Sequence, residues 1–184
     1  VLLGSPESVQ NFLKELKALK AENYTKESYK ALTDAIAKVE ELGDLSKLSK
    51  KQLDQAAELL STAKKGLVSV EALEQAVART EAVDETLYTK DSYQALKETL
   101  KPVEQLRNNG TADQIQAAVN AIDQAIRNLK VRVSADYVKD YMDSIVFNDK
   151  EKDYTKDSYQ AYKNAYDRLV ALSKDVENIS KEEF

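Results

Sequence analysis

The chain has 184 residues, of which 42% are hydrophobic and 32% charged, and its 27 basic and 32 acidic side chains give a formal net charge of −5. This composition is near that of globular proteins and excludes a disordered chain, and an acidic surface lacks the positive footprint of a nucleic-acid-binding protein. Histidine and cysteine are both absent, which excludes Cys–His and Ser–His catalysis, thiol redox chemistry and His- or Cys-ligated zinc.

Helix-forming residues dominate the sequence, whereas glycine occurs 4 times and proline twice. Ala, Leu, Lys, Glu and Gln all favour helices, so we expect an all-α fold. No apolar run reaches the roughly 18 residues that a membrane-spanning helix requires, and we expect no membrane insertion. The chain opens at Val1 without a signal peptide, which we interpret as the start of an excised fragment.

Three helices are expected at the start of the chain, over residues 6–19, 26–42 and 50–65. Ser5 precedes the first, and the third follows Ser-Lys-Lys-Gln at 49–52, which fits the S/T-x-x-E/Q capping box. Apolar residues recur with the 3.6-residue period of a helix. In the second range they are Tyr29, Leu32, Ile36, Val39 and Leu42, and their later counterparts are Tyr93, Leu96, Leu100, Val103 and Leu106. One apolar stripe per helix predicts a three-helix bundle.

A six-residue motif, Tyr-Thr-Lys-Glu/Asp-Ser-Tyr, marks the start of the second helix and then recurs. It occupies residues 24–29, 88–93 and 154–159, so the period is about 65 residues. In the first copy we expect Thr25 to cap the helix, Glu27 to interact with the helix dipole, and Tyr24 and Tyr29 to form a hydrophobic staple. The motif is therefore interpreted as structural rather than as a ligand site.

The recurrence divides the chain into three expected domains. They are repeat 1 at 1–67, repeat 2 at 68–132 and a partial repeat 3 at 133–184. Ser69 and Ser134 precede the first helices of the later repeats, and Ser180 begins a third helix that is truncated after Phe184. The connections between repeats are short and not rich in Gly, Ser or Pro. We expect tandem three-helix bundles stacked end to end as a rod, with the third bundle incomplete.

No catalytic, cofactor or metal site is predicted. The acidic run from Asp149 begins like a calcium loop, but loop positions 6 and 12 hold Tyr154 and Gln160 instead of Gly and Glu. There is no Gly-rich phosphate loop, and neighbouring acidic residues on one helix do not face each other. An enzyme that uses carboxylates alone remains an alternative for this chain.

Tyrosine is the one unusual residue type, because six of the ten tyrosines lie in the third segment. Tyr162 and Tyr166 align with core positions of the first repeat and Tyr141 aligns with Phe12, so we expect most of these rings in the core. Only Tyr137 aligns with small or polar residues. Exposed tyrosines can stack on sugars or anchor a protein partner. Tyr137 and Tyr141 are therefore the candidate ligand-binding residues.

The Tyr-Thr-x-x-Ser-Tyr motif resembles the start of the FIVAR repeat. The third helix of that repeat ends in Ala-x-x-x-Leu, which matches residues 63–67 and 125–129. The resemblance covers the first two repeats fully and the third partly. It implies an extracellular setting, in cell-wall-anchored surface proteins and large secreted glycan-degrading enzymes of Gram-positive bacteria. There such repeats are spacers or accessory modules, some suspected of binding sugar or matrix, and the family has no catalytic residues.

These observations together favour a non-catalytic extracellular helical repeat region. It would act as a spacer or stalk of a bacterial cell-surface or secreted protein, with adhesive binding to a host glycan or an extracellular matrix protein. We expect a monomer that needs no cofactor and has no nucleic-acid partner. The alternative from another class is an intracellular helical scaffold that binds partner proteins through its helix faces.

Overall fold

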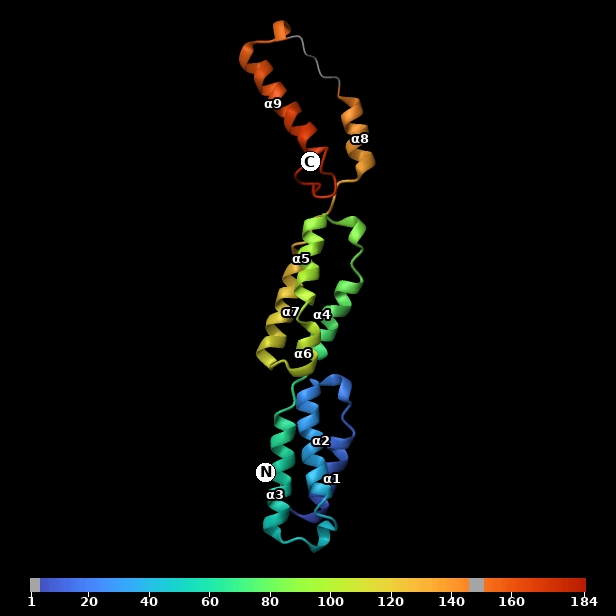
Figure 1. Ribbon diagram of the computed structural model, residues 1–184, viewed down its shortest axis with the longest axis vertical. Coiled ribbons are helices and arrows are strands. Elements are labelled where there is room, and N and C mark those ends of the chain that lie inside the picture. Colours follow the sequence, from blue (N-terminus) through green and yellow to red (C-terminus); the bar gives the residue numbers. More distant parts are fainter. Residues whose placement is uncertain (1–3, 146–150) are drawn as a thin grey trace. The chain divides into compact units, whose positions relative to one another are not determined.

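The computed structural model describes residues 4–145 and 151–184, and helices make up nearly all of their regular structure (Figure 1). The helices are α1 (Pro6–Lys17), α2 (Lys26–Glu40), α3 (Lys50–Lys65), α4 (Glu71–Glu81), α5 (Lys90–Leu100), α6 (Val103–Asn109), α7 (Ala112–Arg127), α8 (Ala135–Ser144) and α9 (Lys156–Leu172). Only isolated bridges represent β-structure in these two ranges. The prediction of an all-α chain of tandem helical bundles is confirmed. Asp149, where the rejected calcium loop would begin, lies outside the described residues.

The helices begin where the capping residues predict. The Ser5 side chain accepts from the Ser8 amide at 3.1 Å, and Ser49 forms the expected capping box with Gln52. Thr25 caps α2 through the Ser28 amide at 3.4 Å. These side-chain oxygens satisfy amides that have no partner within the helix.

Two helices end earlier than predicted, and the first of them is α1, which ends at Lys17 instead of residue 19. Helix α2 ends at Glu40, so Leu42 lies beyond it and is 42% exposed instead of joining the apolar stripe. Helix α4 begins at Glu71, two residues after Ser69, whose hydroxyl accepts from the Glu71 amide at 3.3 Å. Ser69 thus precedes α4 as predicted, and for α1 and α2 the helical periodicity was right while the predicted ends were two residues too far along the chain.

The first repeat is a three-helix bundle with a continuous apolar core. The buried side chains come from one face each of α1, α2 and α3, as the periodicity predicts. They are Val9, Phe12, Leu16, Leu32, Ile36, Val39, Leu53, Ala56, Ala57 and Leu60. Alanines on α3 let its backbone approach the other two helices closely.

The second repeat differs from the first in its middle helix. The predicted single helix through Leu106 is interrupted at 101–102, so α5 ends at Leu100 and α6 begins at Val103. Pro102 explains the break, because proline has no amide hydrogen and its ring clashes with the preceding helical turn. The capping box before α7 is confirmed, with the Thr111 amide donating to Gln114 Oε1 at 2.9 Å and the Gln114 amide donating to Thr111 Oγ1 at 3.2 Å.

The chain divides into two compact units that do not coincide with single repeats. One unit runs to Ala78 and includes Leu100–Ala121, and the other holds Arg79–Thr99 and Ile122–Phe184. Each unit therefore contains one junction between consecutive repeats. The repeat limits 1–67, 68–132 and 133–184, and the end-to-end rod, stay predictions.

Within the first unit, α6 packs against α2, although the two helices belong to different repeats. Lys26 Nζ lies 3.4 Å from Glu104 Oε1. Arg107 forms a bidentate pair with Glu74, with both N–O distances at 2.7 Å. This guanidinium lowers the pKa of the Glu74 carboxyl by hydrogen bonding, and Glu74 in turn raises the pKa of Arg107.

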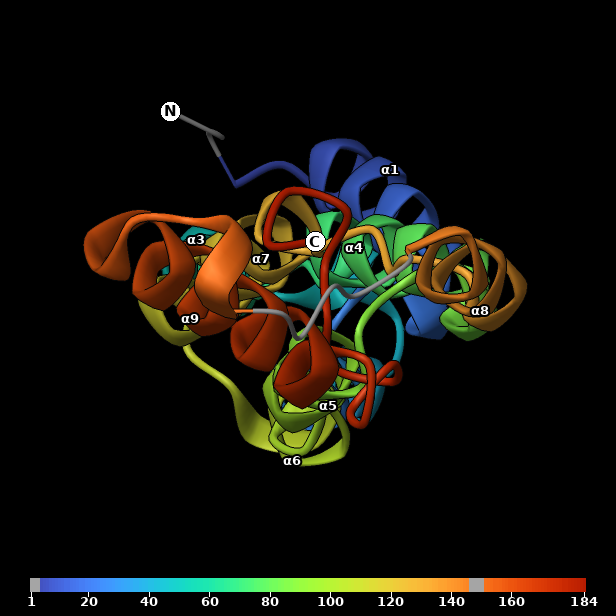
Figure 2. The same ribbon diagram turned by 90° about the horizontal axis from the view of Figure 1, so that it is seen from above.

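The third segment has a much smaller core than the first repeat. Its buried residues are Val133, Val138 and Ile179, and helix α9 has none. Helices α8 and α9 lie apart in both views, and Figure 1 shows them converging toward the C-terminal turn (Figures 1 and 2). The turn begins with the predicted capping box, in which the Ser180 amide donates to Glu183 at 3.0 Å and the Glu183 amide donates to Ser180 Oγ at 3.3 Å.

The expected core burial of the third-segment tyrosines is wrong. Tyr162 and Tyr166 are half-buried, and Tyr141 is 44% exposed where its counterpart Phe12 is 6% exposed. In the first repeat, α3 covers these positions. In the described part of the third segment only the short turn from Ser180 lies beside α8 and α9, so most of their apolar stripes stay uncovered.

Candidate functional site

The recurring motif forms a hydrogen-bonded clasp with the linker that follows α3. Ser28 Oγ donates to the Thr25 carbonyl at 3.1 Å and accepts from Thr25 Oγ1 at 2.8 Å and from the Val68 amide at 3.1 Å. A serine hydroxyl offers one donor and two acceptor positions, and all three are used here. Two backbone bonds complete this first junction, from Thr25 N to the Val68 carbonyl at 2.9 Å and from Val70 N to the Asn23 carbonyl at 3.0 Å.

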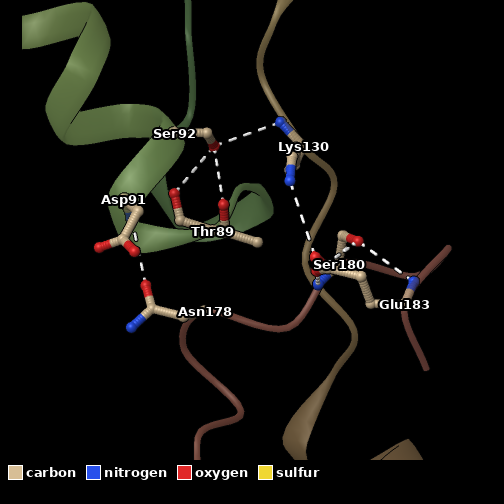
Figure 3. A network of polar contacts seen from close by, with 7 residues as sticks. All are labelled: Thr89, Asp91, Ser92, Lys130, Asn178, Ser180 and Glu183. Atoms are coloured by element: carbon tan, nitrogen blue, oxygen red, sulfur yellow. Dashed lines mark hydrogen bonds and ion pairs between the residues drawn. The ribbon is translucent and has the colours of Figure 1, made fainter.

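The second junction repeats this geometry around Thr89 and Ser92 (Figure 3). Ser92 Oγ donates to the Thr89 carbonyl at 3.0 Å and accepts from Thr89 Oγ1 at 2.9 Å and from the Lys130 amide at 3.2 Å. Thr89 N donates to the Lys130 carbonyl at 2.9 Å, and Arg132 N donates to the Leu87 carbonyl at 2.9 Å. Thr25 and Thr89 are each 1% exposed, so the threonine of each clasp is shielded from water, while the serines Ser28 and Ser92 are half-buried.

A third chain segment joins the second junction from the other side. Lys181 N donates to the Val131 carbonyl at 2.9 Å, and Val133 N donates to the Ile179 carbonyl at 3.1 Å. The same segment covers the start of α5, where the Asp91 amide donates to Asn178 Oδ1 at 3.2 Å (Figure 3). An acceptor there is useful because the first amides of a helix have no intrahelical partner.

The clasp confirms part of the interpretation of the motif and extends it. The predicted staple is present, since the Tyr24 and Tyr29 rings stack with centroids 6.3 Å apart. Sequence reasoning missed the role of the motif serine, which binds a linker amide about 40 residues away in sequence. The available signal was the serine itself, which occurs in all three copies although threonine already caps the helix.

A cavity of about 750 Å³ lies beside the second junction and holds both candidate ligand-binding tyrosines. Tyr137 and Tyr141 are 57% and 44% exposed, and their rings lie 6.4 Å apart at an interplanar angle of 23°. The Phe184 ring meets both edge-on, at 5.9 and 5.4 Å. The structure thus brings the two predicted residues together and adds Phe184, which is too distant in sequence to have been grouped with them.

The charged side chains that line this cavity are both cationic. Arg132 is half-buried and Lys181 is exposed, and neither side chain forms a hydrogen bond or ion pair with any described residue. No aspartate or glutamate lines the cavity. Asp136 and Asp140 are close in sequence to the tyrosines but do not line the cavity. The pKa of Lys139 is raised chiefly by its hydrogen bond to Asp143, and the charges of Asp140 and Asp136 raise it further.

A larger hollow of about 860 Å³ between α1 and the turn after α2 carries less chemistry. Most of its charged side chains are already engaged, because Lys17 pairs with Glu40 and Asp44 accepts from Ser46 at 2.7 Å, whereas Lys14 forms no ion pair with a described residue. Within residues 4–145 and 151–184, no three metal-ligating side chains gather. The helices in those ranges also include none long and apolar enough to cross a membrane.

Comparison with known proteins agrees with the repeat. The FIVAR domain family matches residues 7–68 and 69–130. The chain is also similar to a polysaccharide lyase 8 family protein, HylA, of Enterococcus faecalis (strain ATCC 700802 / V583), with 27% identity over an alignment of 171 residues that covers 86% of this chain. The chain spans only 12% of the length of that relative. No solved structure matches the chain.

Proposed function

Because the chain belongs to the FIVAR domain family, we propose that it is a non-catalytic repeat region that acts as a spacer in a bacterial cell-surface or secreted protein. The relative is a polysaccharide lyase family protein of which this chain matches a small fraction, which supports an accessory role beside other domains. No combination of residues in the described chain suggests a reaction. A Gram-positive extracellular location is part of the proposal.

The clasp is the observation that carries the spacer role. A spacer has to keep the segments it separates from folding back on each other, so its linkers have to resist bending. At each junction the linker donates to and accepts from the preceding repeat through at least three hydrogen bonds, at 2.9–3.2 Å. Linkers held in this way lose the torsional freedom of a flexible chain.

Adhesive binding to a host glycan or a matrix protein is the second part of the proposal, and the cavity around Tyr137 and Tyr141 supports it. Tyrosine provides a large apolar face and a polar tip, and such side chains dominate many binding surfaces. The intracellular scaffold reading has less support. In the first repeat the described large apolar side chains that are exposed are Leu42 and Leu59, too few for a helix-binding groove.

Distance measurements across the first junction test the spacer role. The natural absence of cysteine allows clean spin labelling of Glu58→Cys on α3 and Gln116→Cys on α7, both at exposed positions. We expect a narrow distance distribution that Ser28→Ala broadens, with Ser158→Ala as the matched control. A distribution already broad in the labelled parent would contradict a stiff spacer. Small-angle scattering should show an elongated particle.

A further inference from the structure

We propose that the cavity beside the second junction binds an acidic saccharide, a sugar chain that bears carboxylate or sulfate groups. The inference rests on the adhesive part of the proposed function and names its ligand class. Three observations carry it: exposed apolar side chains gather at the cavity, the corresponding positions of the first junction lack them, and the only charged side chains in the lining are cations that pair with no described residue.

Exposed apolar side chains concentrate at this one place. Seven large hydrophobic residues are exposed in the described chain, and four of them line the cavity. These four are Leu87, Val131, Tyr137 and Tyr141. Single exposed hydrophobics are ordinary on a protein surface, whereas a cluster beside a cavity marks a binding site.

The fold itself does not require three of these side chains, whereas Tyr141 occupies a position that is buried in the first repeat, at Phe12. The residue before the motif tyrosine is Asn23 at the first junction and Leu87 at the second. The linker residue that forms a β-bridge with the motif tyrosine is Ser69 at the first junction and Val131 at the second. Ala72 occupies the position of Tyr137. The first junction has the same clasp with polar or small residues, so the apolar patch belongs to the second junction alone.

The charge of the lining points to an anion. Arg132 takes the place of Val70, because each donates its amide to the residue before the motif tyrosine. Arg132 is half-buried and has no described carboxylate partner, although the chain has more acidic than basic residues, so its guanidinium can bind an anionic ligand. A planar guanidinium and a nearby ammonium group suit carboxylate or sulfate oxygens.

Size and surface chemistry favour a sugar over a protein as the source of that anion. A cavity of about 750 Å³ is in the range of small-ligand sites, whereas a stable protein partner would need about 800 Å² of matching surface. The C–H groups of a sugar ring carry partial positive charge and are attracted to the negative face of an aromatic ring. The Tyr137 and Tyr141 hydroxyls form no hydrogen bond with a described residue and can bond to sugar hydroxyls.

Affinity electrophoresis and titration calorimetry of the 184-residue chain test the proposal. The probes are two carboxylated polysaccharides, alginate and polygalacturonate, two sulfated ones, chondroitin sulfate and heparin, and neutral dextran. At least one acidic probe should bind while dextran does not. Arg132→Gln and Lys181→Gln should each weaken binding about tenfold, since hydrogen bonds to charged groups are worth more than neutral ones. Tyr137→Ala with Tyr141→Ala should abolish it.

Lys163→Gln on α9, an exposed lysine that does not line the cavity, is the matched charge control and should leave binding unchanged. Arg132→Gln retains the backbone bonds of the junction, so circular dichroism should show intact folding. Failure of every acidic probe to bind would overturn the proposal. So would equal losses from Lys163→Gln and Arg132→Gln, which would indicate non-specific charge attraction.

Two further outcomes would also overturn the saccharide assignment. One is self-association in light scattering that the tyrosine substitutions abolish. The other is binding to fibronectin or collagen, tested beside the polysaccharides, that depends on Tyr137 while the acidic sugars do not bind. The second outcome would leave the adhesive function standing. Neither outcome affects the spin-label distances, so failure of the ligand class and failure of the spacer role can be told apart.

Discussion

The two junctions have the same internal hydrogen bonds and different surfaces. In each, a threonine and a serine of the motif hold a linker through main-chain groups, with Thr25 and Ser28 at the first and Thr89 and Ser92 at the second. The outward side chains are small or polar at the first junction and apolar or cationic at the second. Because the clasp binds the backbone, linker side chains can change without weakening it, and surface chemistry can diverge at constant architecture.

The junctions also differ in the number of chains that meet. The segment around Ser180 bonds to the second linker through Lys181 N and the Ile179 carbonyl. At the first junction the equivalent segment is residues 109–111, just before α7. Among the described residues, no backbone hydrogen bond joins this segment to the first linker, residues 66–70. The second linker is therefore hydrogen-bonded on both sides, and its residues Val131, Arg132 and Val133 also line the cavity.

Removing a buried cap should have the largest effect. Thr25→Ala should lower the free energy of unfolding by about 1–2 kcal/mol, because this buried threonine caps α2 and both the cap and its hydrogen bond to Ser28 Oγ are lost. Thr155→Ala should cost about 1 kcal/mol or less, since Thr155 makes the same bonds to Ser158 at the start of α9 but is exposed to water. Urea denaturation followed by circular dichroism measures both. Equal losses would show that burial at the junction adds nothing to the cap.

The motif serine comes next. Ser28→Ala and Ser92→Ala should each cost about 1 kcal/mol and should speed hydrogen exchange at the Val68 and Lys130 amides, which lose their acceptor. Ser158→Ala is the control, because no described linker amide bonds to that hydroxyl. If exchange at Val68 stays slow in Ser28→Ala, the backbone bonds hold the linker without the serine.

The Glu74–Arg107 pair distinguishes the first unit by its pH response. The lowered pKa of Glu74 means that its stabilising contribution is present above the ordinary value of 4.5 and is lost as the pH falls through the lowered value. Glu74→Gln should cost less than about 1 kcal/mol at neutral pH, because both side chains are partly exposed and the pair is screened. The difference between the variant and the parent should vanish in acid, and a difference that persists at pH 2 would contradict an ionic origin.

Replacing exposed apolar side chains of the second junction by their counterparts from the first should have the smallest effect on stability. Leu87→Asn with Val131→Ser should change stability by no more than about 0.5 kcal/mol, since both residues are exposed and the clasp uses their backbone. Binding of a hydrophobic fluorescent dye should fall. A loss above 1 kcal/mol would show that these side chains support the junction, which would weaken the argument for a binding surface.

Local signals in the sequence predicted the helices well. The capping residues and the 3.6-residue period identify the first bundle, and Pro102 breaks a helix that the period alone predicts as continuous. Burial in the third segment could not be predicted from alignment with the first, because Tyr141 depends on a covering helix rather than on its own helix. The cavity depends on long-range packing, and Phe184 and Lys181 meet Tyr137 only after folding.

The full use of the motif serine's hydrogen-bonding capacity has a consequence for how such arrays evolve. Ser28 and Ser92 bind the main chain of the following linker, so a repeat with the motif can precede any linker that offers an amide and a carbonyl at the right spacing. Duplication, deletion or shuffling of whole repeats then needs no matching substitutions at the new boundary. The number of repeats can therefore change by recombination within the gene. At each new junction the exposed linker side chains can then change under selection.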